Sequence, residues 1–124
     1  MSRLSIGILF AVAVLVASAA SEASAHALLQ QAVPAVGGTV SSSPTEIRLK
    51  FSEGVEPHFS VIALQSESGV TEQLGKATVA TGDSSTLVAA VPQALKPGVY
   101  TVNWHVVSVD THKTQGTFQF TVKP

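Results

Sequence analysis

Residues 46–51 are Glu46-Ile47-Arg48-Leu49-Lys50-Phe51, in which charged and apolar side chains alternate without a break. Successive side chains of a β-strand point to opposite faces of the sheet, so the three apolar residues share one face and the three charged residues share the other. The hexapeptide therefore predicts a strand whose apolar face covers a core and whose charged face meets water.

The same alternation recurs toward the C-terminus, in residues 100–106 and 117–122. Residues 59–65 and 85–91 are apolar and rich in β-branched side chains, and we expect strands there too. Glycine and proline separate these runs at intervals of roughly 8–12 residues, and no apolar stripe of helical period follows residue 25. The pattern predicts an all-β fold, either an antiparallel sandwich or a Greek-key barrel.

The start of the chain has the features of an export signal. Arg3 provides a positive charge, residues 6–17 are an uninterrupted apolar run, and Ala23-Ser24-Ala25 has the small-x-small pattern that a signal peptidase accepts. The apolar run has only twelve residues, which is too few to cross a bilayer. We predict a cleaved signal peptide rather than a membrane anchor.

Cleavage after Ala25 fits the rule best, and cleavage after Ala20 is the weaker alternative. We therefore assign residues 1–25 to the signal peptide and residues 26–124 to a single domain. The mature protein is expected outside the cytoplasm, in the periplasm if the source is Gram-negative.

The composition excludes several classes of protein. Seven Lys and Arg against eight Asp and Glu give a formal net charge of −1 with no basic cluster, so nucleic acid is not an expected partner. The absence of cysteine removes disulfides, thiolate zinc sites, iron–sulfur clusters and cysteine nucleophiles. No second hydrophobic stretch follows the signal, so we expect no membrane-inserted segment. Metal chemistry would have to use His, Asp, Glu and backbone donors.

His26 becomes the first residue of the mature protein if the predicted cleavage occurs. A free α-amine, with a pKa of about 7.7–8.0, can then bind a metal together with the imidazole of the same residue. An internal histidine has no free α-amine and cannot form this chelate. The alternative is that His26 follows the cut by accident, because signal peptidases tolerate most residues at that position.

Asp110 and His112 form a second candidate pair. If residues 108–112 stay extended, the two side chains lie on one face with their Cα atoms about 6–7 Å apart. The alternative is a polar turn in which Asp110 makes turn hydrogen bonds. Of the other two histidines, His105 is expected to point away from the core because it alternates with Trp104. His58 is expected in a loop.

Together, His26, Asp110 and His112 would supply an amine nitrogen, two imidazole nitrogens and a carboxylate oxygen. Cu(II) favours a tetragonal set of such donors and has the highest affinity for them, with zinc as the main competitor. Cu(I) favours sulfur ligands, and the chain has no cysteine and no methionine after Met1. The residues therefore favour oxidised copper as the bound ion.

Six stretches match a known family in order and spacing: His26-Ala27-Leu28-Leu29, Val33-Pro34-Ala35, Leu49-Lys50-Phe51-Ser52-Glu53, Gly98-Val99-Tyr100-Thr101-Val102-Asn103-Trp104, Val106-Val107-Ser108-Val109-Asp110-Thr111-His112 and Gly116-Thr117-Phe118-Gln119-Phe120. Over these stretches the chain resembles the periplasmic copper-binding CopC family. The resemblance implies an immunoglobulin-like or cupredoxin-like Greek-key β-sandwich or barrel of about seven strands. It also implies copper handling without enzymatic activity, together with an inner-membrane partner of the CopD type.

The resemblance also implies roles for particular residues. The copper ligands would be His26, through its amine and side chain, with Asp110 and His112. Glu53 matches a family carboxylate near the metal, as a weak axial ligand or a partner of a ligand, and Trp104 matches a core residue. Residues 65–80 lack the methionines with which some members bind Cu(I), so a carrier of Cu(II) alone is implied.

Two other functions stay open. A mature N-terminal histidine resembles the copper site of lytic polysaccharide monooxygenases, although the small domain offers no aromatic platform for a glycan. A metal-free immunoglobulin-like interaction module in the periplasm is the other alternative, and it would bind copper no better than a generic histidine peptide.

Overall fold

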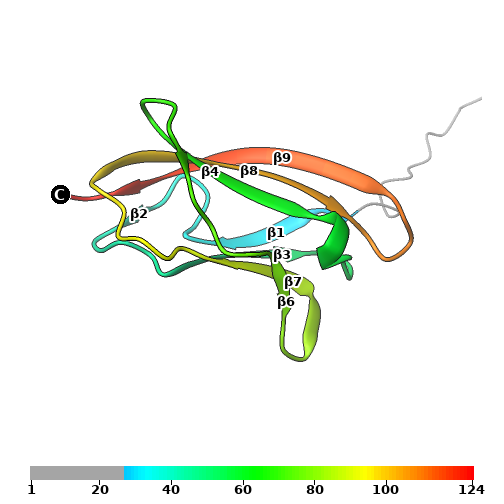
Figure 1. Ribbon diagram of the computed structural model, residues 1–124. Helices are drawn as coiled ribbons and strands as arrows, with labels where there is room; N and C mark the ends of the chain where they lie inside the picture. The colour runs from blue at the N-terminus through cyan, green and yellow to red at the C-terminus, as the bar shows by residue number, and fades with distance from the viewer. Residues whose placement is uncertain (1–26) are drawn as a thin grey trace, which may run out of the picture.

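Two β-sheets face each other in residues 27–124, the part of the chain that the computed structural model describes. Figure 1 shows the two layers from the side. His26 and the predicted signal peptide, residues 1–25, lie outside the described residues.

One sheet has four strands in the order β1-β3-β7-β6, and the other has five in the order β2-β9-β8-β4-β5. The first sheet contains β1 (Leu29–Val33), β3 (Glu46–Phe51), β6 (Thr78–Ala80) and β7 (Asp83–Ala90). The second contains β2 (Thr39–Val40), β4 (Val61–Ser66), β5 (Thr71–Glu72), β8 (Gly98–Val107) and β9 (Lys113–Val122). A short 3-10 turn, η2 (Pro57–Phe59), precedes β4.

The strand predicted at residues 46–51 is β3, and its alternation has the expected effect. Ile47, Leu49 and Phe51 are buried, whereas the charged residues between them are partly exposed. Across the core, β8 buries Trp104, whose ring meets the Phe51 ring edge-on with centroids 5.1 Å apart. The core therefore lies between the two sheets and is built by strands of period two.

The all-β prediction is confirmed, with three differences of detail. The two sheets form an open sandwich and not a closed barrel. The described residues contain nine strands where about seven were expected, because β2, β5 and β6 are edge pieces of two or three residues. Phe59, expected in a strand, belongs to η2, because Pro57 begins a tight turn there and β4 starts only at Val61.

Tyr100, near the start of β8, contacts the loop that precedes this strand. Its hydroxyl donates to the Lys96 carbonyl at 2.7 Å, and its ring stacks on Phe120 with centroids 5.7 Å apart. Burial raises the pKa of the Tyr100 hydroxyl above its ordinary value, so the group stays a neutral donor. Among residues 27–124, no cluster of metal ligands lies at this end of the sandwich.

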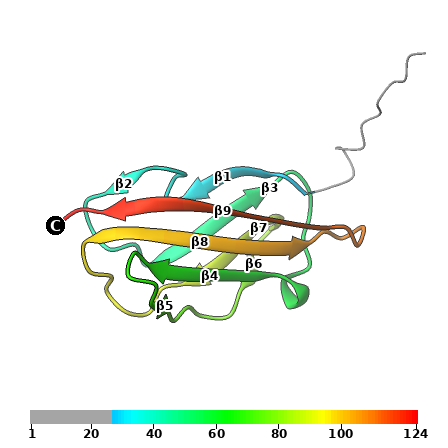
Figure 2. The same ribbon diagram turned by 90° about the horizontal axis from the view of Figure 1, so that it is seen from above.

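At the opposite end, three segments that are far apart in sequence meet. These are the start of the described chain, the loop after β3 and the turn between β8 and β9 (Figure 2). Within residues 27–124, no helix has the length and apolar character that a bilayer crossing would require.

Candidate metal centre

A tight turn joins β8 to β9 and carries Asp110 and His112. The Ser108 N–H donates to the His112 carbonyl at 2.9 Å, and the Thr111 N–H donates to the Ser108 carbonyl at 2.8 Å. Thr111 has a φ of 73°, in the left-handed region that a β-branched residue seldom occupies. The segment is therefore a turn and not the extended stretch considered from the sequence. Asp110 does make turn hydrogen bonds, as the alternative interpretation expected.

The turn brings the Asp110 and His112 side chains together. His112 Nδ1 lies 3.2 Å from Asp110 Oδ1, and the two side chains are 48% and 42% exposed. The same oxygen accepts a hydrogen bond from the His112 N–H at 3.4 Å and a short one from the Ser108 hydroxyl. In a straight strand the two side chains would point the same way without meeting. The bend at Thr111 brings them into contact.

The Ser108 hydroxyl stabilises the ionised form of the Asp110 carboxylate. Its side chain is fully buried, and its hydrogen bond is the main cause that holds the pKa of Asp110 below the ordinary value, followed by the hydrogen bond from His112. Asp110 is therefore an ionised oxygen donor at neutral pH. The hydrogen bonds from the Ser108 hydroxyl and the His112 N–H and the contact with His112 Nδ1 all involve Oδ1.

The spacing of the two donors fits a shared metal ion. Ligands at about 2.0–2.2 Å from an ion and at right angles to each other are about 3 Å apart. The observed separation of 3.2 Å between His112 Nδ1 and Asp110 Oδ1 agrees with this value. Residues 27–124 contain no group of three or more His, Cys, Asp or Glu residues that could hold a metal. In this pair, one nitrogen and one oxygen are thus as close together as neighbouring ligands of one metal ion would be.

The described chain begins beside this turn. The Ala27 carbonyl accepts a hydrogen bond from Thr114 Oγ1 at 2.9 Å, and Thr114 lies two residues after His112. The Leu28 N–H donates to Ser52 Oγ at 2.8 Å, and the Ser52 N–H donates back to the Leu28 carbonyl at 2.8 Å. His26, the third ligand expected from the sequence, directly precedes Ala27 but lies outside the described residues.

Glu53 lies in the loop that contacts both segments. Ser52, before it, binds Leu28, and the carbonyl of Gly54, after it, accepts from the Val109 N–H at 3.0 Å. The Glu53 side chain is partly exposed and makes no hydrogen bond or ion pair with residues 27–124. The fold brings this carboxylate to the same end of the sandwich as Asp110 and His112.

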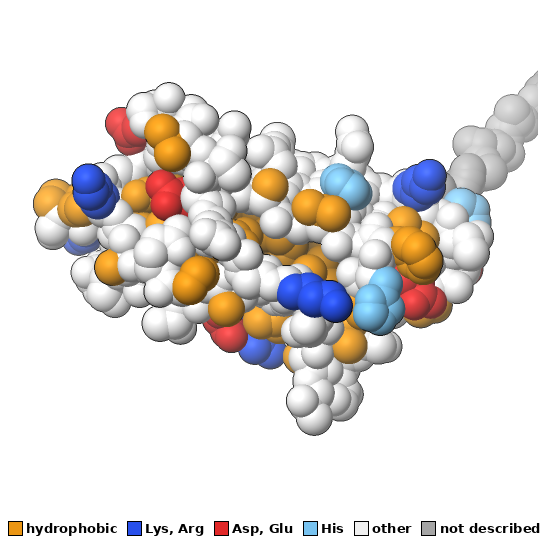
Figure 3. All heavy atoms as spheres, in the orientation of Figure 1, with side chains coloured by type: hydrophobic (Ala, Val, Ile, Leu, Met, Phe, Trp, Pro, Cys, Tyr) orange, Lys and Arg blue, Asp and Glu red, His pale blue; other side chains and the backbone are white. Residues whose placement is uncertain are grey.

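His58 and His105 are both exposed. His105 points away from the core, as its alternation with Trp104 predicted, and His58 lies in η2. On the face shown in Figure 3, acidic and basic side chains are scattered and do not gather into a patch of one sign. That distribution agrees with the near-neutral charge of the chain.

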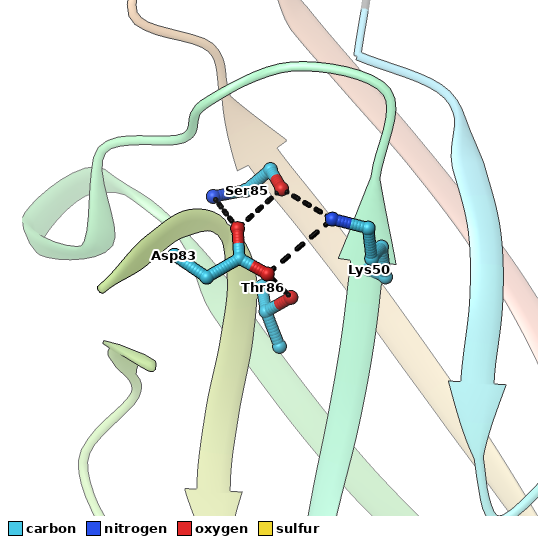
Figure 4. Close-up of polar contacts among 4 residues, drawn as sticks. All are labelled: Lys50, Asp83, Ser85 and Thr86. Atoms are coloured by element: carbon cyan, nitrogen blue, oxygen red, sulfur yellow. Dashed lines mark hydrogen bonds and ion pairs between the residues drawn. The ribbon is translucent and has the colours of Figure 1, made fainter. Parts of the chain in front are cut away.

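A second polar cluster, drawn in Figure 4, surrounds Asp83 at the start of β7. Asp83 Oδ1 accepts from the Ser85 N–H at 3.0 Å and from the Ser85 hydroxyl at 2.6 Å. Oδ2 accepts from Thr86 Oγ1 at 2.7 Å and from Lys50 Nζ at 3.3 Å. These bonds, led by that of the Ser85 hydroxyl, hold the pKa of Asp83 far below its ordinary value. Both oxygens are occupied by protein donors, so the cluster ties β7 to β3 and offers no metal site.

Sequence reasoning missed three residues of the candidate centre. Ser108 stood in the matched stretch but was given no role, although serine and aspartate are both common turn residues. Ser52 and Thr114 had no local signal. Their partners, Leu28 and Ala27, are 24 and 87 positions away in the sequence.

Comparisons with known proteins agree with this architecture. The family model of the CopC domain matches residues 29–123. The chain is 42% identical over 99 residues to Protein YobA of Escherichia coli K12, with 80% of each chain covered. It is 35% identical over 115 residues to copper resistance protein C of Escherichia coli, covering 88% of this chain and 90% of that protein.

A solved structure is similar as well. The crystal structure of CopC from Methylosinus trichosporium OB3b superposes with a TM-score of 0.75 at 32% identity, covering 80% of this chain and 95% of that one. Sequence and fold agree over the same two-sheet domain. The chain therefore belongs to the CopC family.

Proposed function

We propose that this protein binds one Cu(II) ion outside the cytoplasm, through His26, Asp110 and His112, and sequesters it or delivers it to a membrane transporter. The observation that carries the proposal is the 3.2 Å approach of His112 Nδ1 to Asp110 Oδ1, beside the anchored start of the domain. Copper is the cargo of this site.

Cleavage after Ala25 would complete the ligand set. It frees an α-amine on His26, whose Cα is about 3.8 Å from that of Ala27 across a trans peptide. The Ala27 carbonyl is bonded to Thr114, close to His112 in sequence. The short tether supports a site in which the amine and imidazole of His26 join the two donors of the turn. Glu53, in the adjoining loop, would contribute a nearby negative charge or a weak axial oxygen.

Copper would replace a proton at the turn. In the metal-free protein, a proton shared between His112 Nδ1 and Asp110 Oδ1 accounts for their contact. A metal between the two donors displaces that proton, while Ser108 continues to hold the carboxylate. Copper binding should therefore release protons and weaken as the pH falls, because the imidazoles and the amine become protonated.

Two features support Cu(II) in preference to Cu(I). The donors are nitrogen and oxygen, and residues 26–124 contain no cysteine or methionine to supply sulfur. A relative that this chain matches over most of its length, copper resistance protein C of Escherichia coli, carries copper in its name. The paired donors and this relative favour copper handling over the metal-free interaction module and the small monooxygenase.

The proposal also includes the route of the protein. A signal peptide at residues 1–25 would take the domain to the periplasm, and a CopD-type protein of the inner membrane would be the transporter that receives copper. The export signal in the sequence supports the first step. An exposed site at one end of the sandwich, where a partner can approach, supports the second.

The first experiment is a Cu(II) titration against a competing chelator, with electron paramagnetic resonance of the loaded protein. The chain beginning at His26 should bind one equivalent in a tetragonal, nitrogen-rich site. A chain with one glycine added before His26 should bind at least about tenfold more weakly, because the α-amine is then no longer on the residue that carries the imidazole. Equal affinity of the two chains would overturn the N-terminal site.

Side-chain variants test the turn in the same assay. His112→Ala should weaken binding by a similar factor, and Asp110→Asn by less, because an amide oxygen is a neutral and poorer donor. His105→Ala is the matched control, since His105 is an exposed imidazole on β8. Similar losses in His105→Ala and His112→Ala would indicate nonspecific surface binding.

A further inference from the structure

We propose that Thr114 and Ser52 are positioning residues, which fix the start of the domain so that the residue before Ala27 is presented to Asp110 and His112. The inference rests on the proposed function and adds two residues to it that bind no metal themselves. It concerns the three hydrogen bonds that tie Ala27 and Leu28 to the β3 loop and to β9.

Ala27 and Leu28 lie beyond the end of the β-ladder. The pairing of β1 with β3 begins at Leu29, which lies opposite Phe51. A chain end outside a ladder normally frays, because its backbone groups have no partner that fixes them. In this domain the side chain of Thr114 supplies a donor to the Ala27 carbonyl, from a strand of the other sheet. The bond therefore joins the chain start to the sheet that carries the metal-binding turn.

Ser52 fixes the next residue at two points. Its hydroxyl accepts from the Leu28 N–H, and its own N–H donates to the Leu28 carbonyl, both at 2.8 Å. The Leu28 side chain is 52% exposed, so burial contributes little to its placement. Ser52 thus continues the pairing of β1 with β3 by one residue. Its hydroxyl takes the place of a backbone carbonyl as the acceptor for the Leu28 N–H.

The Ala27 methyl group supplies the last constraint. Ala27 is 1% exposed and belongs to the hydrophobic core. Its side chain, its carbonyl and the following peptide are therefore each held by a different neighbour. A chain end fixed in this way loses its conformational freedom when the domain folds, so little is left to lose when a metal binds. Both hydroxyls would act by preorganising a ligand residue and not by touching the ion.

Single substitutions can remove each hydroxyl with little change of shape. Thr114→Val removes the donor to Ala27, Ser52→Ala removes the acceptor for Leu28, and Thr114→Ser restores the hydroxyl of the first. Thr117→Val is the matched control, because it deletes a hydroxyl from the same strand that makes no side-chain hydrogen bond with the described residues. Thermal unfolding confirms that each variant is folded.

The first measurement uses the metal-free chain beginning at His26. Heteronuclear nuclear Overhauser effects of the Ala27 and Leu28 amides should fall in Thr114→Val and Ser52→Ala and stay unchanged in Thr117→Val. Thr114→Ser should recover most of the order. Unchanged order at both amides in Thr114→Val and Ser52→Ala would overturn the anchoring, whatever the metal affinity.

The second measurement is Cu(II) affinity and the paramagnetic resonance spectrum of the same variants. Thr114→Val and Ser52→Ala should each weaken binding about tenfold and broaden the spectrum, with recovery in Thr114→Ser. Loss of order at Ala27 with unchanged affinity and spectrum would overturn the positioning role. The proposed function fails by a different result, namely equal binding by the unmodified chain and its glycine-extended form.

Discussion

The Trp104 ring lies directly against the backbone of Gly116, its partner across the β8–β9 ladder. A methyl group built on Gly116 would stand 2.6 Å from Cζ2 of the indole and 2.9 Å from Cε2. The indole also meets the Phe51 ring edge-on. A larger residue at position 116 would therefore have to displace the ring from its contact with Phe51.

Gly116→Ala should destabilise the domain by about 1–3 kcal/mol, the usual effect of overpacking a core. Thermal unfolding measures the loss, and the emission of Trp104 should shift as the indole is displaced. Gly75→Ala is a control, because the added methyl would meet the Ala90 Cβ at 3.3 Å, a contact that a small shift relieves. Equal stability of Gly116→Ala and the unmodified protein would contradict the contact.

Ser108→Ala should raise the pKa of Asp110 toward its ordinary value. The hydroxyl of Ser108 is the chief cause of the lowered pKa, and the hydrogen bonds from His112 would remain. Carboxyl chemical shifts of Asp110, followed from neutral to acidic pH, measure the change. Cu(II) binding by this variant should also fall off at higher pH than in the unmodified protein, because protons compete better for the carboxylate. A titration of Asp110 that does not move would show that Ser108 has no such effect.

Asp83→Asn should lower stability at neutral pH and flatten its dependence on acid. The pKa of Asp83 is depressed in the folded state, so its contribution is complete above the unfolded value of about 3.9 and declines as the pH falls through the folded value. An asparagine cannot titrate, and the NH2 of its amide replaces one carboxylate oxygen, so either Ser85 or Thr86 loses the acceptor of its hydroxyl.

Urea unfolding at pH 7 and at successively lower pH measures this difference. Lys50→Met is the graded control, since the Lys50 contact at 3.3 Å is the last of the causes that lower the pKa of Asp83. Its effect should be smaller than that of Asp83→Asn. The reverse order would mean that the ion pair, and not the two hydroxyls, stabilises the cluster.

Thr111→Gly should leave the domain as stable as before or up to about 1.5 kcal/mol more stable. A left-handed residue with a Cβ costs roughly 1–2 kcal/mol, and glycine removes this strain while costing about 0.5–1 kcal/mol in chain entropy. Denaturant unfolding measures the net effect. Thr101→Gly is the comparison, because Thr101 lies inside β8, where glycine only weakens the strand. A clear loss of stability in Thr111→Gly would refute the strain.

The sequence allowed good prediction wherever local periodicity determines structure. The alternation in β3 settled both its bounds and the residues that it buries. Alternation did not predict β1, because its residues Leu29–Val33 are mostly exposed. They form a strand because β3 offers an edge to pair with. Pairing partners of that kind are a property of the assembled sheet.

The candidate centre shows the same limit. Asp110 and His112 were identified from their types and spacing, but their convergence depends on the left-handed Thr111, a position where residue preference points away from threonine. The bond from Thr114 to Ala27 depends on contact between two sheets. Only the folded chain reveals which hydroxyl supports which segment.

The Thr114–Ala27 bond also has a consequence for the order in which the domain forms. It joins positions 87 residues apart, so it requires most of the chain to be present and both sheets to be packed. Contacts of such long sequence separation form late, because the loop they close has a large entropy cost. The segment around Ala27 is thus among the last parts of the described domain to be fixed in place. Until both sheets have packed, the start of the domain lacks the support of Thr114, and it becomes ordered only in the finished fold.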